Sequence, residues 1–235
     1  MKVKIIATAI LIALSINNYS QITAWEETPW GANVLTWIYD EADPEDREYG
    51  DEYYRDSFPN VTYLYHGDQY SSSDKFNCHG YVWYMSDVAD GPGFSDKRRV
   101  EESNGTLPYI SDNISYKVVS TEAEADIVWW NDGSHSAMTT GIPGTWRSKW
   151  DVGPLVQHDW DDQPYGTTGL VYYKRCFHRL TAIYSEDIEM EHCKVQFLNS
   201  SVSNNVDFEV SYEDWVQIEG TFNTGTGATL DIHPN

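Results

Sequence analysis

The sequence predicts an α+β domain in which one helix packs on an antiparallel sheet, with a small β appendage at the C-terminal end. Two observations predict this class. Apolar residues between Cys78 and Val88 recur at the spacing of a helix with one buried face. Three strand-like runs then follow in close succession, separated by Asn-Asp-Gly and Gly-Ile-Pro-Gly, which are turn sequences. Such a meander offers a face on which the helix can pack.

The chain of 235 residues is long enough for one main domain with an appendage and short for two full domains. Changes in composition divide it into a signal peptide, an acidic and aromatic wrap, a core and a β-rich appendage, over residues 1–20, 21–73, 74–178 and 179–235. The signal has a basic start and an apolar run too short to span a bilayer, and no later run is apolar enough. We therefore expect a secreted, periplasmic or cell-surface protein without a membrane span.

The elements are expected in the following order. A short helix is predicted near 33–41, and the acidic run that follows it reads as a solvated loop, with an oxygen-rich cation site as the alternative. The helix that starts at Cys78 comes next, with Asp74 or Asn77 as its cap. Strands are then predicted at 125–130, 134–140, 145–150 and 169–173. The tail reads as short β-strands, which either cover an edge of the main sheet or bind a partner.

Charge and cysteine content limit the function. There are 37 acidic and 15 basic residues, and the net charge of −22 disfavours nucleic acid as a partner. Three cysteines are an odd number for an exported protein. We expect Cys176 and Cys193 to form a disulfide, which leaves Cys78 as a free thiol.

The pentad Asn-Cys-His-Gly-Tyr at 77–81 is the most informative motif, because a histidine, His135, heads a predicted strand downstream. A thiol at a helix N-terminus beside an imidazole is the arrangement that thiol-dependent acyl transfer needs. His79 is an alternative base, but neighbouring helix residues point about a hundred degrees apart. A zinc site built from Cys78, His135, His79 and His66 lacks the spacing of known zinc motifs, so we predict no metal and no cofactor.

The strings NCHGYVWYMSD, DIVWWNDGSHSAMTTG and RSKWDVGPLVQHDWDDQPYG resemble the papain-like cysteine hydrolases, close to the CHAP and NlpC-like groups. They are similar in particular to uncharacterised exported proteins of Bacteroidota that carry the same Asn-Cys-His-Gly-Tyr motif. The resemblance covers roughly residues 70 to 175 and, more weakly, the tail. It implies a papain-like core whose nucleophile helix packs on an antiparallel sheet.

The resemblance also implies roles for individual residues. Cys78 matches the nucleophile and His135 the general base. The strand after the histidine offers Ser148 where the family has an acid or amide, so we favour Asp151 as the residue that orients His135, with Ser148 and His158 as alternatives. The oxyanion donors would be the backbone N–H of Cys78 with a polar side chain, either Asn77 or Tyr70.

We therefore expect an exported cysteine hydrolase, an amidase or peptidase, that cleaves an amide bond through a thioester intermediate. Its substrate would be peptidoglycan, as the resemblance favours, or a polypeptide, as the acidic charge favours. The alternative is a catalytically inactive papain-like module that serves binding or adhesion at the cell surface. The sequence does not indicate an oligomeric state.

Overall fold

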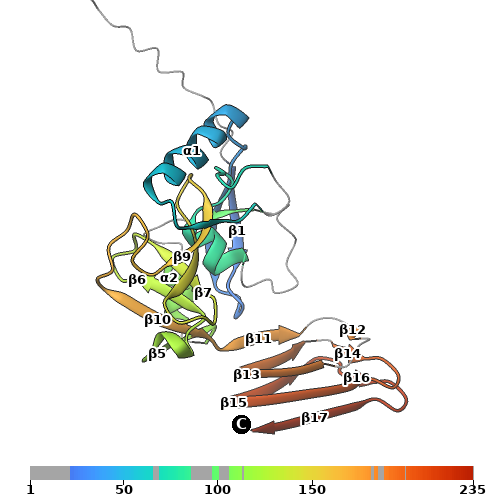
Figure 1. Cartoon of the computed structure of the whole chain (residues 1–235). Coiled ribbons are helices and arrows are strands. Elements are labelled where there is room, and N and C mark those ends of the chain that lie inside the picture. Colours follow the sequence, from blue (N-terminus) through green and yellow to red (C-terminus); the bar gives the residue numbers. More distant parts are fainter. Residues whose placement is uncertain are drawn as a thin grey trace, which may run out of the picture.

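The computed structural model describes residues 22–65, 69–85, 97–100, 106–112, 114–180, 183–184, 188–198 and 200–234. Over these residues the protein is mostly β, with several sheets and few helical turns (Figure 1). The predicted α+β class, a papain-like core with a nucleophile helix on an antiparallel sheet, is therefore wrong. The predicted signal peptide lies outside the described residues.

The largest sheet has seven strands in the order β3-β9-β8-β7-β6-β10-β5, and each strand is antiparallel to its neighbours. The strands are β3 Thr62–Tyr63, β5 Tyr116–Val119, β6 Ile127–Trp130, β7 Ser136–Thr139, β8 Thr145–Lys149, β9 Leu155–Asp159 and β10 Leu170–Arg175. The predicted meander is present as β6, β7 and β8, and the predicted strand at 169–173 is present as β10. Strand β9 was not predicted, because it ends in three polar residues, Gln157, His158 and Asp159.

The segment that carries Cys78 is not the regular helix that the apolar spacing predicts. Cys78 and His79 form a first helical turn, which continues as the π-helical segment η1, Gly80–Met85. Five of the six η1 residues are buried, so the segment is enclosed on nearly all sides and shows no single buried face. The rest of the predicted helix, from residue 86 to 88, lies outside the described residues.

The N-terminal segment also differs from its prediction. The helix expected near 33–41 is instead β2, Asn33–Ile38, which pairs with β1, Ile22–Glu27, and with β4, Arg99–Val100. Val34 and Thr36 are buried at alternate positions, as in a strand with one covered face. The helix comes later, where the acidic run expected to be a loop forms α1.

Helix α1 spans Pro44–Ser57 and lies at the end of the molecule opposite the C-terminal sheets (Figure 1). Proline and two acidic residues in the first turn favour a helix start. The proline has no N–H to satisfy, and the carboxylates interact favourably with the positive end of the helix dipole. Two further short helices within the described residues are α2 Leu107–Ser111 and the 3-10 turn η3 Glu122–Glu124.

The seven-stranded sheet is covered on both faces. One face packs against η1 in an aromatic core that includes Trp83, Tyr109, Tyr116 and Tyr173. The opposite face carries a second cluster with Val128, Trp130, Ala137 and Trp146 as its buried members. Successive residues of β6 and β7 therefore point to different cores, which fixes the direction of the side chains near His135.

The tail forms two parallel sheets of its own. Strands β11 Phe177–Leu180, β13 Ile188–Leu198, β15 Asp207–Glu219 and β17 Thr229–Pro234 make one, and β12 Ile183–Tyr184, β14 Ser201–Val202 and β16 Asn223–Thr224 make the other. The chain alternates between the two, so that successive coils stack in parallel register over a small apolar core. Neither sheet is hydrogen-bonded into the seven-stranded sheet over the described residues, so the tail does not extend that sheet.

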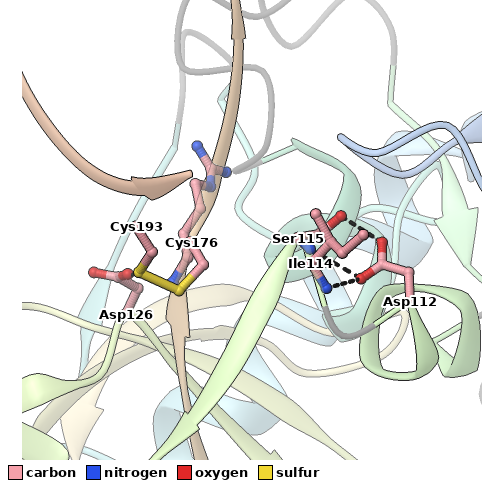
Figure 2. Close-up of a disulfide and its surroundings, with 7 residues drawn as sticks. Asp112, Ile114, Ser115, Asp126, Cys176 and Cys193 are labelled. Carbon is pink, nitrogen blue, oxygen red and sulfur yellow. Dashed lines mark hydrogen bonds between the residues drawn. A yellow bond between two sulfur atoms is a disulfide. The ribbon is translucent and has the colours of Figure 1, made fainter. Parts of the chain in front are cut away.

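A disulfide between Cys176 and Cys193 joins the start of the tail to β13, with 4.6 Å between the two Cα atoms (Figure 2). Beside it, the backbone N–H of Arg175 donates to Asp126 Oδ2 at 2.7 Å. Asp112 holds the neighbouring loop by accepting from the N–H groups of Ile114 and Ser115, at 2.9 Å each. Trp30 packs edge-on against Phe177 and Trp215 and so bridges the first hairpin and the tail.

Among the described helices, none is long and apolar enough to cross a membrane.

Candidate functional site

Cys78 is a free thiol at the start of the helical segment, and its side chain is 2% exposed. Asn77 caps the segment: its Oδ1 accepts from the N–H of Gly80 at 2.8 Å and of Val100 at 3.1 Å, and its Nδ2 donates to the Val100 carbonyl at 2.8 Å. Because the amide oxygen and one amide hydrogen are committed in this way, Asn77 acts as the cap and the tie to β4. These bonds leave little freedom for the oxyanion role predicted for it.

His79 anchors the cysteine segment to β7. Its Nε2 donates to the carbonyl of Gly133 at 2.9 Å, so its Nδ1 accepts from the hydroxyl of Ser136 at 2.7 Å. The indole N–H of Trp83 donates to the same hydroxyl oxygen at 2.9 Å. Burial lowers the pKa of His79 to about 4, which keeps the imidazole neutral and this chain of hydrogen bonds intact at neutral pH.

In the sequence, His135 lies between the two residues that His79 contacts, Gly133 in the turn and Ser136 in β7. Its ring stacks on Tyr165 with 3.7 Å between centroids and meets the edge of Trp130 at 4.8 Å, on the face opposite Ser136. The side chain is fully buried, and within the described part of the chain neither ring nitrogen has a hydrogen-bond partner. Burial, then the neighbouring His79 and His158, hold its pKa well below the usual value, so the ring is neutral.

A second chain of hydrogen bonds, again from an indole through a serine hydroxyl to an imidazole, lies on the face of the sheet that carries the His135 ring. The indole N–H of Trp150 donates to Ser148 Oγ at 2.9 Å, and the Ser148 hydroxyl donates to His158 Nε2 at 2.9 Å. His158 Nδ1 donates to the Asp159 carbonyl at 2.7 Å, which fixes the tautomer. Ser148 and His158, both predicted as partners of His135, are therefore bonded to each other, and neither orients His135.

Asp151 and Tyr70, the other predicted support residues, also contact different groups. Asp151 forms an ion pair with Arg99, and half of its side chain is exposed, so it does not hold His135. Tyr70 faces the guanidinium of Arg47, 5.2 Å from the ring centroid, on the side of α1. The structure thus joins the cysteine motif to the histidine strand through His79, while none of the three predicted orienting residues is hydrogen-bonded to His135.

Lys149 is a buried residue that the sequence interpretation missed. Its ammonium donates to the carbonyls of Ser73 at 2.8 Å and Gly153 at 2.6 Å and also contacts the carbonyl of Asp151. Its side chain is fully buried, and the ammonium lies 5.0 Å from the ring centroid of Phe76. The available signal was its place in the predicted strand 145–150, where alternation puts it on the face opposite Trp146 and Ser148.

Within the described residues, no group of three histidine, cysteine or acidic side chains could hold a metal ion. Comparison of the chain with family models, with curated proteins and with solved structures gives no match.

Proposed function

We propose that this protein is a cysteine hydrolase that cleaves an amide bond, with Cys78 as nucleophile and His135 as general base. One observation carries the proposal: His135 is a fully buried imidazole with two unpaired ring nitrogens in the described structure, next to the strand residues that anchor the cysteine segment. Buried polar groups are nearly always hydrogen-bonded, so an exception calls for an explanation, of which a catalytic role is one. The imidazole is neutral and its nitrogens are unpaired in the described structure, so one of them can accept a proton, but the burial that lowers its pKa also makes it a weaker base.

Two further observations support the assignment. His79 contacts Gly133 and Ser136, on either side of His135, and so holds Cys78 close to the strand that carries the base. Cys78 opens a segment that continues as a π-helix, a conformation frequent at functional sites. Catalysis requires a rearrangement, because the His135 ring lies on the face opposite Ser136, the residue to which the cysteine segment is bonded. No hydrogen bond joins the thiol to either His135 nitrogen in the described structure, and Tyr165 covers the ring.

The proposed reaction has two steps. The thiol of Cys78 gives its proton to His135, the sulfur attacks the amide carbonyl carbon, and the departing amine takes the proton from His135, which leaves a thioester. Water then gives a proton to His135 and attacks the thioester, which releases a carboxylic acid and returns the proton to sulfur. Burial of the imidazole keeps it unprotonated between turnovers.

The proposed substrates are the amide bonds of peptidoglycan stem peptides or of polypeptides. The motif resemblance to exported CHAP and NlpC-like hydrolases supports the first and also supports export; the net charge of −22 supports the second.

Turnover of purified peptidoglycan and of an unfolded polypeptide tests the proposal. Cys78→Ala and His135→Gln should each lower turnover about a thousandfold or more, while the exposed His233→Gln serves as control and should not change it. Unchanged turnover in Cys78→Ala would refute the proposal.

A second candidate, an inactive binding or adhesion module, is favoured by burial. Cys78 is 2% and His135 0% exposed, so neither side chain reaches solvent in this structure. Co-sedimentation with peptidoglycan that is the same for wild type and Cys78→Ala, without any hydrolysis, would support this candidate over the first.

A further inference from the structure

A cavity of about 260 Å³ lies between α1 and the turn that follows β8, and neither Cys78 nor His135 lines it. One wall is a face of α1 that includes Asp46, Tyr49 and Tyr53, and the other is formed by Asp74 and the turn at Val152. A water molecule occupies about 30 Å³ in the liquid, so the cavity has room for several waters or for one side chain. Its volume therefore suits one small ligand group such as a side chain.

Two glycines bring the walls together. A Cβ on Gly50 would lie 2.9 Å from Ser72 Oγ, and a Cβ on Gly153 would lie 2.4 Å from the Tyr54 ring. Glycine inside a helix is destabilising by roughly 0.5–1 kcal/mol relative to alanine, so its presence at position 50 calls for a packing reason. The close approach of α1 to residue 72 supplies that reason.

Buried hydrogen bonds hold both walls in place. The Asp51 carboxylate accepts from the N–H groups of Ser71 and Ser72 at 2.9 and 2.8 Å, and Arg47 Nε donates to the Ser72 carbonyl at 2.8 Å. On the other side, the three carbonyls around Lys149 tie the turn to Ser73. The cavity is therefore preformed.

The charges around the cavity favour a cation. Asp46 is exposed, and the half-buried carboxylate of Asp74 has no hydrogen bond or ion pair in the described part of the chain. Arg47 also lines the cavity, but its guanidinium donates to the Ser72 carbonyl and is paired with Glu41. The nearby cations are engaged as well, Arg99 with Asp151 and Lys149 with its three carbonyls. A half-buried carboxylate without a donor is stabilised by a ligand that brings one.

Aromatic rings complete the site. Tyr49 is 70% and Tyr53 57% exposed, and both line the cavity together with Tyr54, whose ring lies 5.3 Å from that of Tyr53. Tyrosine faces attract ammonium groups and also pack against alkyl chains. Carboxylates beside exposed tyrosine rings suit a ligand with a cationic group on an alkyl chain, because the carboxylates can pair with the charge and the rings can pack against the chain.

We propose that this cavity binds the ammonium group of a lysine side chain or of another alkylamine, with Asp74 and Asp46 as its counter-charges and Tyr49 and Tyr53 against its stem. This binding site is separate from the chemistry proposed for Cys78, and it would recognise basic polypeptide segments. Free alkylamines share the same chemistry, and the probes below distinguish the two sources.

The test is a titration of the full chain, with labelled tyrosine resonances observed by NMR. N-acetyl-lysine amide should shift the resonances of the cavity tyrosines, and N-acetyl-norleucine amide, which keeps the stem without the charge, should bind at least about tenfold more weakly. If 1,5-diaminopentane binds as tightly as the lysine amide, the ligand is a free alkylamine; weaker binding identifies a peptide ligand. Equal affinity for the lysine and norleucine amides would overturn the proposal.

Matched variants localise the site. Asp74→Asn should weaken binding of the lysine amide about tenfold, because a charge-assisted contact is lost. Asp56→Asn removes the same charge from the exposed end of α1, outside the cavity, and should leave the affinity unchanged. If the two variants have the same effect, the cavity is not the binding site. Because no turnover is measured, this result is independent of whether Cys78 is catalytic.

Discussion

His79 Nδ1 lies 2.7 Å from Ser136 Oγ, and this hydrogen bond joins the cysteine motif to the histidine strand. The two residues are 57 positions apart, the same separation as Cys78 and His135, which immediately precede them. The contact brings the two motifs together, although the thiol and the His135 ring are not hydrogen-bonded in the described structure. The buried hydrogen bond between His79 and Ser136 therefore bears on both the stability of the fold and the proposed activity.

Ser136→Ala should destabilise the protein by about 2–3 kcal/mol. The change leaves the Trp83 indole N–H and His79 Nδ1 buried without their partner, and each unsatisfied group is unfavourable by about 1–3 kcal/mol. Urea unfolding measures the difference. The exposed Ser134→Ala is the control and should stay within about 0.5 kcal/mol of wild type. Equal effects of the two changes would show that the hydrogen-bond chain does not stabilise the fold.

Stability should fall as the pH drops from about 6.5 towards 4. In the unfolded chain His79 takes up a proton near its ordinary pKa of 6.5, but in the folded protein burial lowers the pKa to about 4. Protonation therefore favours the unfolded state between pH 6.5 and 4. His79 alone contributes about 3 kcal/mol to the free energy of unfolding, which is fully present above pH 6.5 and is lost as the pH falls towards 4. His135 and His158, whose pKa values burial also lowers, add to the decline.

Urea unfolding at pH 7.5, 6 and 5 checks this pH dependence. His79→Gln should make the decline shallower, whereas His233→Gln should not, because the hydrogen bond to Glu209 raises the pKa of the exposed His233 and so acts in the opposite direction. A flat profile over this range in the wild type would mean that the buried histidines do not control stability.

Gly80→Ala should lower the melting temperature strongly. A Cβ at this position would lie 1.9 Å from the carbonyl oxygen of Arg98, which is backbone and cannot rotate away. Overpacking of this kind is destabilising by about 1–3 kcal/mol or more. Gly166→Ala is the matched control, because nothing lies within 4 Å of its added methyl. Thermal unfolding of both variants should show a shift only for the first.

Loss of the Cys176–Cys193 disulfide should destabilise the tail. The bond closes a loop of 17 residues, for which the loss of unfolded-chain entropy is worth about 3 kcal/mol. Unfolding of the double variant Cys176→Ser/Cys193→Ser, followed by tryptophan fluorescence, measures this effect. Reductant should reproduce it in the wild type and should not affect the double variant; a wild type insensitive to reductant would contradict the prediction.

Local patterns predicted part of this structure. Turn sequences and alternating apolar residues identified the strands now seen as β6, β7, β8 and β10, because hairpin turns and strand periodicity are local properties. The helix expected at 33–41 is wrong because this segment pairs as a strand with the adjacent β1 and with β4, which is distant in sequence, and Val34 and Thr36 are buried at alternate positions of that strand. The acidic run forms α1, and its local start signals, Pro44 with Glu45 and Asp46, were available in the sequence. The bonds from the Asp51 carboxylate to the backbone of Ser71 and Ser72, which tie α1 to the domain, join residues distant in sequence and were not.

The candidate site was predictable in its parts but not in its connections. The motif pointed to Cys78 and His135, yet the partners of Ser148, His158 and Asp151 depend on which face of the sheet each side chain takes. Ser148 and His158 face the same side and bond to each other, while Asp151 follows β8 in a turn and meets Arg99 from another sheet. Lys149 was missed because its three acceptors are backbone carbonyls.

The reactivity of the Cys78 thiol tests the central claim most directly. Purified protein is treated with iodoacetamide between pH 5 and 9, and mass spectrometry measures the rate of modification at Cys78 in the wild type and in His135→Gln. A thiol that gives its proton to His135 should be modified well below pH 8, and the variant should require a higher pH. If Cys78 is modified only after unfolding in urea, or if His135→Gln leaves the pH profile unchanged, the hydrolase account is contradicted.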